Sequence, residues 1–290
     1  MDSLEKMRTI RETDMRQWVR TGEGRTAESF DHADGKTMMK LYLDFVPEEL
    51  IRRELHMAQA AYAMGLPTPV PGELIRCGAR YGCTFGRIEH KRSFSRAMAD
   101  EPARMEEYAL RFADMAKKLH STPCDKSVFP AYREKLTNTI RQLSVFSQEE
   151  KQTLLRFLYS VEDTGTCIHG DLHIGNVVTD GTQDYLIDMG DFSYGNPLFD
   201  LGSLFYLSHF LPDANVQREY HISPADFRRF WDLFAGAYFD AHTPEKLSEV
   251  EILMGPYSAF HALMAMEHEP SLVRTAYRVR DMLPEMEKYI

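Results

Sequence analysis

Up to about residue 88, short apolar runs alternate with glycine-containing turns, a pattern typical of antiparallel β-strands. We predict strands at 16–20, 25–32 and 37–43, and two more within 73–88. The turns between them are predicted at 21–24, at Asp34-Gly35 and at 78–81. Tyr81, Cys83 and Phe85 alternate along the last strand and therefore share one of its faces.

A single helix is predicted in this part of the chain, opening at Pro47 and ending near Met64. Gly65 and Pro67 follow, as is usual after a helix end. The first part thus predicts a small five-stranded antiparallel sheet with one helix.

Beyond residue 89 the apolar positions recur with a helical period. They lie at Met105, Ala109, Phe112, Ala116 and Leu119, the buried stripe of a long helix ending near His120. Further helices are predicted at 133–143, 147–160, 197–210, 224–241 and 246–287, the last broken at Pro256 and Pro270. The fold class predicted is α+β with two lobes, a nucleotide-binding lobe over 1–88 and a mainly helical lobe over 89–290.

One hairpin interrupts the helical part, with its turn at Asp180-Gly181. If its loop has four residues, Thr179 pairs with Asp184, and Asn176 then falls beside Asp188. An amide oxygen next to a carboxylate suits Mg²⁺, which keeps waters and phosphates as its other ligands. We therefore predict Asn176 and Asp188 as metal ligands.

Asp171 precedes Asn176 by five residues, the spacing of the kinase catalytic loop. In that loop the aspartate accepts the proton of the attacking hydroxyl, which predicts Asp171 as the catalytic base. Asp200 opens an apolar helix, so its predicted role is structural, as a helix cap or a brace for the loop backbone. Two roles are open for Asp191: a group near the metal, or a brace for the loop.

Glu54 falls on the apolar side of the first helix, where a carboxylate is costly unless it is paired. The predicted partner is Lys40 on the third strand, rather than Lys36 beside the hairpin turn. A strand lysine held by a helix glutamate is how kinases contact the nucleotide phosphates. Gly22 and Gly24 are candidates for a close approach to phosphate, and the backbone at Ile88 for pairing with a purine.

Composition narrows the class of partner. The formal net charge is −10, which argues against nucleic-acid binding, because phosphate contacts need clustered positive charge. The four cysteines show no metal-site or disulfide spacing, and no apolar leader or membrane span is expected. We expect a cytoplasmic protein, with its oligomeric state open.

Several motifs together resemble the aminoglycoside phosphotransferase and choline kinase family. They are HGDLHIGN (169–176), LIDMGD (186–191), NPLFDL (196–201), AKKLHSTP (116–123) and GLPTP (65–69). The resemblance implies a protein-kinase-like fold, ATP or GTP as donor, Mg²⁺, Asp171 as base and His169 as an organiser of the loop backbone. The GEGRTAESF loop departs from a full kinase fingerprint, so the nucleotide preference is open. Four acidic residues could bind a polyamine acceptor or simply form a solvated face: Asp226, Glu251, Glu267 and Glu269.

The predicted activity is Mg-dependent transfer of a nucleotide γ-phosphate to a hydroxyl of a small molecule, which is aminoglycoside-like, choline-like or sugar-like. A protein kinase is the first alternative, but 188–200 is too short for a peptide-docking activation segment. A nucleotide-binding pseudoenzyme is the second. A metallophosphoesterase is the third, although the chain lacks that class's further His and Asp motifs.

Overall fold

The computed structural model describes residues 10–268 and 274–290. These residues form two compact units. Unit 1 comprises the chain up to Lys91 together with Val178–Asp191, and unit 2 comprises Arg92–Val177 and the chain from Phe192 onward.

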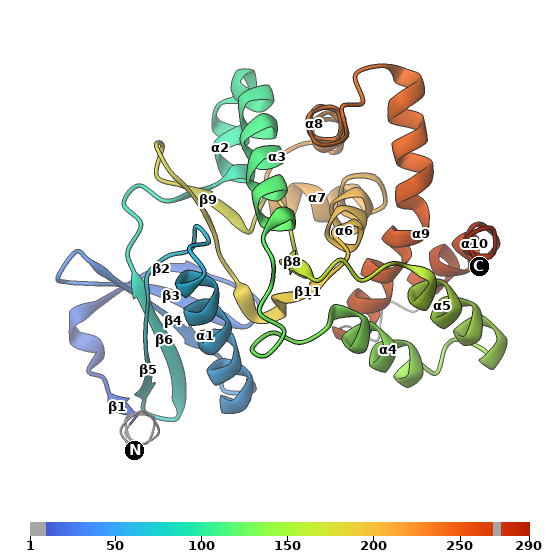
Figure 1. Cartoon of the computed structure of the whole chain (residues 1–290). Coiled ribbons are helices and arrows are strands. Elements are labelled where there is room, and N and C mark those ends of the chain that lie inside the picture. Colours follow the sequence, from blue (N-terminus) through green and yellow to red (C-terminus); the bar gives the residue numbers. More distant parts are fainter. Residues whose placement is uncertain (1–9, 269–273) are drawn as a thin grey trace. The chain divides into compact units, whose positions relative to one another are not determined.

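The sheet of unit 1 contains six strands within the described residues, in the order β1-β5-β6-β4-β3-β2 (Figure 1). Their bounds are β1 Arg11–Glu12, β2 Trp18–Glu23, β3 Ala27–His32, β4 Thr37–Tyr42, β5 Pro71–Cys77 and β6 Arg80–Gly86, with the 3-10 turn η1 at Met15–Gln17. Strands β2 to β6 are antiparallel, as predicted. The prediction missed β1, which pairs parallel with β5 and makes the sheet mixed.

The first hairpin turns later than predicted. Strand β2 continues through Gly22, which lies opposite Ser29, and its pairing shifts by one residue after Arg20. The turn forms at 24–27, where the Gly24 N–H donates to the Ala27 carbonyl at 2.8 Å. The predicted turn at 21–24 is therefore wrong, because a bulge keeps both Thr21 and Gly22 within the strand.

Helix α1, Glu48–Ala63, packs against β5 and β6 on one face of the sheet (Figure 1). Gly65 follows shortly after its end, with a φ of +77° that a residue with a side chain would adopt only with strain. The core under α1 contains Ala27, Tyr42, Ile51, Leu55 and Cys83, with Tyr81 and Phe85 packed against it. This confirms the predicted common face of Tyr81, Cys83 and Phe85. Phe30, Met39, Leu41 and Ile75 form a separate core cluster.

Unit 1 also includes most of the predicted hairpin. Strands β9, Val177–Thr179, and β10, Asp184–Leu186, are paired and leave a four-residue loop, as expected. The Asp180 carboxylate closes the loop by accepting the N–H groups of Thr182 and Gln183. The 3-10 turn η3, Met189–Asp191, follows and packs against α1.

Unit 2 is mainly helical. Its helices are α2 Phe94–Asp100, α3 Met105–Ser121, α4 Tyr132–Gln142, α5 Gln148–Ser160, α6 Leu198–His209, α7 Asp213–Tyr220, α8 Pro224–Phe239, α9 Pro244–His268 and α10 Ala276–Glu287, with η2 at Pro102–Arg104 and short strands β7 Arg92–Ser93, β8 Thr166–Ile168 and β11 Ser193–Gly195. The five stripe residues of α3 are buried as predicted. Helices α2 and α7 were not predicted, since each is too short to show a periodic pattern.

The predicted break at Pro256 is wrong, because α9 continues through it. A helix-interior proline removes one backbone hydrogen bond. Met254, Tyr257, Phe260 and Leu263 on either side are buried, and α9 packs against α6. This burial outweighs the lost bond. Pro270, the other predicted break, lies outside the described residues.

Candidate active site

Lys40 of β4 is held by two carboxylates of unit 1. Its Nζ lies 2.6 Å from Oε1 of Glu54 on α1 and 2.5 Å from Oδ1 of Asp188. The Lys40 side chain is 20% exposed and that of Glu54 is 16% exposed, so this is a largely enclosed ion pair. The structure thus brings together the lysine and glutamate that the sequence paired.

Burial by itself would lower the pKa of Lys40, but the charges of Asp188 and Glu54 outweigh it and raise that pKa. Lys40 is therefore an ammonium at neutral pH, as binding to phosphate requires.

Asp188 adopts an unusual backbone conformation between β10 and η3. Its φ is +61°, in the left-handed region that few residues other than glycine occupy. Its side chain is 47% exposed, so solvent or a ligand can reach the carboxylate that faces Lys40. Strain of this kind is concentrated at functional positions, where the surrounding structure holds it in place.

The Tyr42 ring lies next to Lys40, and Tyr42 was not predicted from the sequence as a residue of this site. Its ring centre lies 5.2 Å from Lys40 Nζ, and the residue is 2% exposed. Burial, followed by the charge of Glu54, raises the pKa of the Tyr42 hydroxyl, which keeps it neutral. Because Tyr42 follows Lys40 by two residues on one strand, their common face could have been read from the sequence.

Asp171 and Asn176 meet in the loop after β8 in unit 2. The Asn176 Nδ2 group donates to the Asp171 backbone carbonyl at 2.9 Å and to Asp171 Oδ2 at 3.1 Å. Because the amide nitrogen is committed to these bonds, the amide oxygen is the atom of Asn176 that can bind a cation.

Three histidines influence the ionisation of the Asp171 carboxyl group. Burial opposes its ionisation, but His173, then His261 and His169, outweigh that effect and hold the pKa of Asp171 well below its usual range. The group is therefore a carboxylate at neutral pH, the form that can accept a proton.

Asp200 ties the backbone of this loop to α6. Its carboxylate accepts the N–H groups of His169 at 2.7 Å and Gly170 at 2.8 Å, and it is 1% exposed. Asp200 is not a helix cap, since Pro197 occupies that position. Of the two structural roles predicted for it, the loop brace is the one observed.

His120 and Tyr238 support Asp200, and sequence reasoning assigned neither a role. His120 Nε2 lies 3.2 Å from Asp200 Oδ2, and its Nδ1 lies 2.8 Å from the Tyr238 hydroxyl. Burial, followed by the charge of Asp200, raises the pKa of Tyr238 to about 12, which keeps its hydroxyl neutral. A buried histidine at the end of α3, in the AKKLHSTP segment, was the available signal.

The structure gives fewer local reasons for the other residues predicted to contact the nucleotide, which are Gly22, Gly24 and Ile88. A side chain at Gly22 would meet Ser29 only at 3.6 Å, so no steric reason requires glycine there. At Gly24 an added Cβ would lie 3.3 Å from the Ala27 carbonyl oxygen, a tight contact. Ile88 is half-buried just after β6, and Asp191 is the last residue of η3.

The acidic residues considered for a polyamine have local partners. Asp226 accepts the Ser223 hydroxyl at 2.6 Å, and Glu267 accepts that of Thr139 at 2.6 Å. Glu251 lies 3.7 Å from His209 Nε2, and burial raises its pKa. Glu269 lies outside the described residues.

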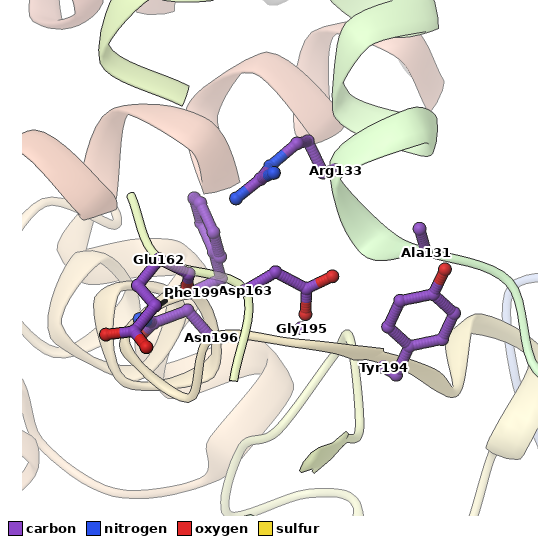
Figure 2. A pocket seen from close by; sticks show the side chains of 8 residues that line it. All are labelled: Ala131, Arg133, Glu162, Asp163, Tyr194, Gly195, Asn196 and Phe199. Atoms are coloured by element: carbon purple, nitrogen blue, oxygen red, sulfur yellow. Dashed lines mark hydrogen bonds between the residues drawn. The ribbon is translucent and has the colours of Figure 1, made fainter. Parts of the chain in front are cut away.

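A small pocket in unit 2 is lined by Ala131, Arg133, Glu162, Asp163, Tyr194, Gly195, Asn196 and Phe199 (Figure 2). Its volume of about 10 Å³ has room for a single water molecule. A wider surface hollow is formed by Phe239, Asp240, Ala241, Lys246, Glu249, Val250 and Leu253. Neither is lined by Asp171 or Asn176, so neither is a candidate for the reacting site.

Within residues 10–268 and 274–290, no helix is long and apolar enough to cross a membrane.

Comparison with solved structures places the fold. The streptomycin–ATP–APH(2″)-IIa ternary complex is 15% identical with a TM-score of 0.59, and the alignment covers 99% of this chain and 98% of that one. ADP-bound APH(2″)-Ib is 17% identical with a TM-score of 0.57, and both chains are covered completely. A choline/ethanolamine kinase family protein from Mesorhizobium loti is 13% identical with a TM-score of 0.51, covering 94% of this chain and 87% of that one. These similarities confirm the predicted kinase-like α+β fold.

A comparison with curated proteins finds no significant match. The model of the phosphotransferase enzyme family (APH), however, matches residues 22–234, well over half of the sequence. That range contains Lys40, Glu54, Asp171, Asn176 and Asp188. The chain therefore belongs to the phosphotransferase enzyme family.

Proposed function

We propose that this protein transfers the γ-phosphate of ATP or GTP to a hydroxyl group of a small molecule, with Mg²⁺ as cofactor. The observation that carries the proposal is the loop in unit 2. There Asp171 is bonded to Asn176, its pKa is held low by neighbouring histidines, and the buried Asp200 holds the preceding backbone. A carboxylate fixed in this way suits the acceptance of a hydroxyl proton.

The nucleotide contacts are assigned to the lobe over 1–88. Lys40, oriented by Glu54, would contact the phosphates, and the neighbouring segments at Gly22, Gly24 and Ile88 would lie along the nucleotide. Structures similar to this chain contain ATP or ADP, which supports a nucleotide donor. The lobe over 89–290 would supply the base and the acceptor site.

Magnesium fits the donor atoms available. Asp188 offers an accessible carboxylate, and Asn176 offers an amide oxygen. Among the described residues no group of three or more His, Cys, Asp or Glu side chains could hold a metal. Mg²⁺ needs no such cage, because it is usually held by one or two protein oxygens with phosphates and waters. When bound, it would neutralise charge that develops on the phosphates.

In the reaction, the acceptor hydroxyl gives its proton to Asp171 as its oxygen bonds to the γ-phosphorus. The bond from that phosphorus to the bridging oxygen breaks, and the nucleoside diphosphate leaves with Lys40 neutralising its charge. Such transfers rest on positioning and charge stabilisation rather than on covalent work by the protein. An aminoglycoside, a choline-like or a sugar-like alcohol would fit. The similar structures include complexes with streptomycin and gentamicin and a choline/ethanolamine kinase family protein.

We place the activity in the cytoplasm, because nucleotides are available there and all four cysteines are free thiols.

The test is a phosphorylation screen of aminoglycosides, amino alcohols and sugars, with ATP and with GTP, followed by nucleoside diphosphate release and product mass. Asp171→Asn is the matched control, since it preserves shape and removes the base. We expect a loss of kcat of about 10²- to 10⁴-fold with nucleotide binding retained. Unchanged kcat would remove Asp171 from the role. Nucleotide binding without turnover on any acceptor would indicate a pseudoenzyme instead.

A further inference from the structure

The loop contains a second histidine, His173, for which the proposed mechanism has no role. We propose that His173 is a positioning residue for Asp171: its Nε2–H group faces Oδ2 of that carboxylate, so that Oδ1 is the oxygen that receives the acceptor's proton. This inference rests on the proposed function and assigns the atom at which its base works.

The contacts of His173 determine where its ring carries the proton. The backbone N–H of Gly175 donates to Nδ1 at 3.0 Å, so Nδ1 must present a lone pair. The proton of the neutral ring is therefore on Nε2, which lies 3.5 Å from Asp171 Oδ2. At this distance the contact is an oriented electrostatic one rather than a short hydrogen bond.

The ring is held in place from two other sides. Tyr220 of α7 packs edge-on against it with ring centres 5.4 Å apart, and His173 is itself only 16% exposed at the side chain. A Cβ added at Gly175 would lie 2.9 Å from His173 Cε1, a distance that real Cβ atoms do not adopt. Glycine at 175 thus leaves the space that the ring occupies.

Two donors now converge on one oxygen of the base. Asn176 Nδ2 donates to Asp171 Oδ2 at 3.1 Å, and His173 Nε2 faces the same atom. Because Oδ2 is the oxygen engaged by both, the acceptor's proton goes to Oδ1 as the new O–P bond forms and the P–O bond to the leaving diphosphate breaks. Fixing one oxygen sets the direction in which the other points, and alignment of this kind governs the rate of transfer.

Two near-isosteric variants separate the two contacts of the ring. His173→Gln places an amide N–H near the position of Nε2 and retains the donor to Asp171. His173→Asn places an amide oxygen near the position of Nδ1 and retains only the acceptor for Gly175. We expect His173→Asn to lower kcat by about 10- to 100-fold with KM nearly unchanged, the range for a partner that orients a functional group. His173→Gln should recover most of this loss.

A purely structural role through Gly175 predicts the opposite order, with His173→Asn the better enzyme. That order, or an unchanged kcat in His173→Asn, would overturn the proposal. In an Asp171→Asn background, His173→Asn should cause no further loss of kcat, because the carboxylate it orients is gone. An additive loss there would also overturn it.

A measurement that requires no enzymatic turnover tests this inference separately from the proposed function. Nitrogen-15 NMR of histidine-labelled protein near pH 8, with His173→Gln to assign the signal, should show Nε2 protonated and Nδ1 unprotonated. A ring protonated on Nδ1 would refute the inference even in an active enzyme. If no acceptor is phosphorylated, the proposed function fails, while the tautomer still decides the contact between His173 and Asp171.

Discussion

At the residue scale, the most informative residues are those whose burial or backbone conformation would cost free energy without a partner. Glu54 lies in a helix stripe that is otherwise buried, and Asp188 has a left-handed backbone beside a lysine. Each is explained by the ion pair that it makes with Lys40. The sequence predicted the first pair because a carboxylate on an apolar helix face requires a partner. Because both were assigned to the Mg-nucleotide, Lys40 and Asp188 were expected near each other, but a direct ion pair between residues 148 positions apart was not predicted.

Asp188→Ala should abolish measurable binding of Mg-nucleotide, because it removes the carboxylate proposed to hold the metal. Isothermal calorimetry with Mg-ATP and Mg-GTP measures the change. Asp44→Ala is the control, since that carboxylate is also in unit 1 but is 81% exposed and makes only a long contact of 3.8 Å with Arg80. Normal affinity in Asp188→Ala would refute the ligand assignment.

At the element scale, α6 carries two constraints of different kinds. Asp200 in its first turn accepts backbone N–H groups from the loop that contains Asp171. Gly202, two residues later, lets α6 approach α9 closely, since an added Cβ would lie 2.6 Å from backbone and side-chain atoms of Tyr257. The helix was predictable from its apolar run, whereas both contacts depend on segments distant in sequence.

Asp200→Asn should lower the free energy of unfolding by about 3 kcal/mol, because a buried charge is lost and one backbone N–H then faces an amide donor. Urea denaturation measures this change. Asp213→Asn, in the exposed first turn of α7, should stay within about 0.5 kcal/mol of the unaltered protein. Equal stabilities for the two variants would contradict the brace.

Gly202→Ala should destabilise the fold by about 1–3 kcal/mol, because the new methyl group overpacks the contact between α6 and α9. Gly236→Ala is a matched control within α8, where the nearest atoms to an added Cβ lie at 3.4 Å. That variant should gain up to about 1 kcal/mol, since alanine favours a helix over glycine. Thermal and urea unfolding of both proteins would show whether the two signs differ; the same sign for both would count against the close approach.

At the scale of the whole molecule, the fold is that of the phosphotransferase enzyme family, and the candidate residues are divided between two compact units. Unit 1 contains Lys40 and Asp188, and unit 2 contains Asp171, the proposed base, with Asn176. Binding of the nucleotide to the folded protein should raise its stability, whichever acceptor the protein uses.

Mg-ATP or Mg-GTP at about 100 times its Kd should stabilise the folded protein by about 2.7 kcal/mol. This corresponds to a rise in Tm of several degrees, measurable by calorimetry or dye fluorescence. Removing Mg²⁺ with EDTA should reduce the rise, and Asp188→Ala should show none. The absence of a shift with either nucleotide in the unaltered protein would contradict nucleotide binding.

The sequence by itself determined the five antiparallel strands, the helix after Pro47 and the long helix α3, because each follows from local periodicity and turn chemistry. It also determined the candidate residues Asp171, Asn176, Asp188, Lys40 and Glu54, since few structural roles account for such polar groups within apolar segments.

Tertiary structure alone decided the rest. It paired β1 with β5 and kept α9 continuous across Pro256. It also brought Tyr238 into contact with His120, and His173 close to Asp171. These features depend on burial and on hydrogen bonds between side chains and distant segments. Their free energies come from packing partners, and a pattern of neighbouring residues contains no information about which partners those are.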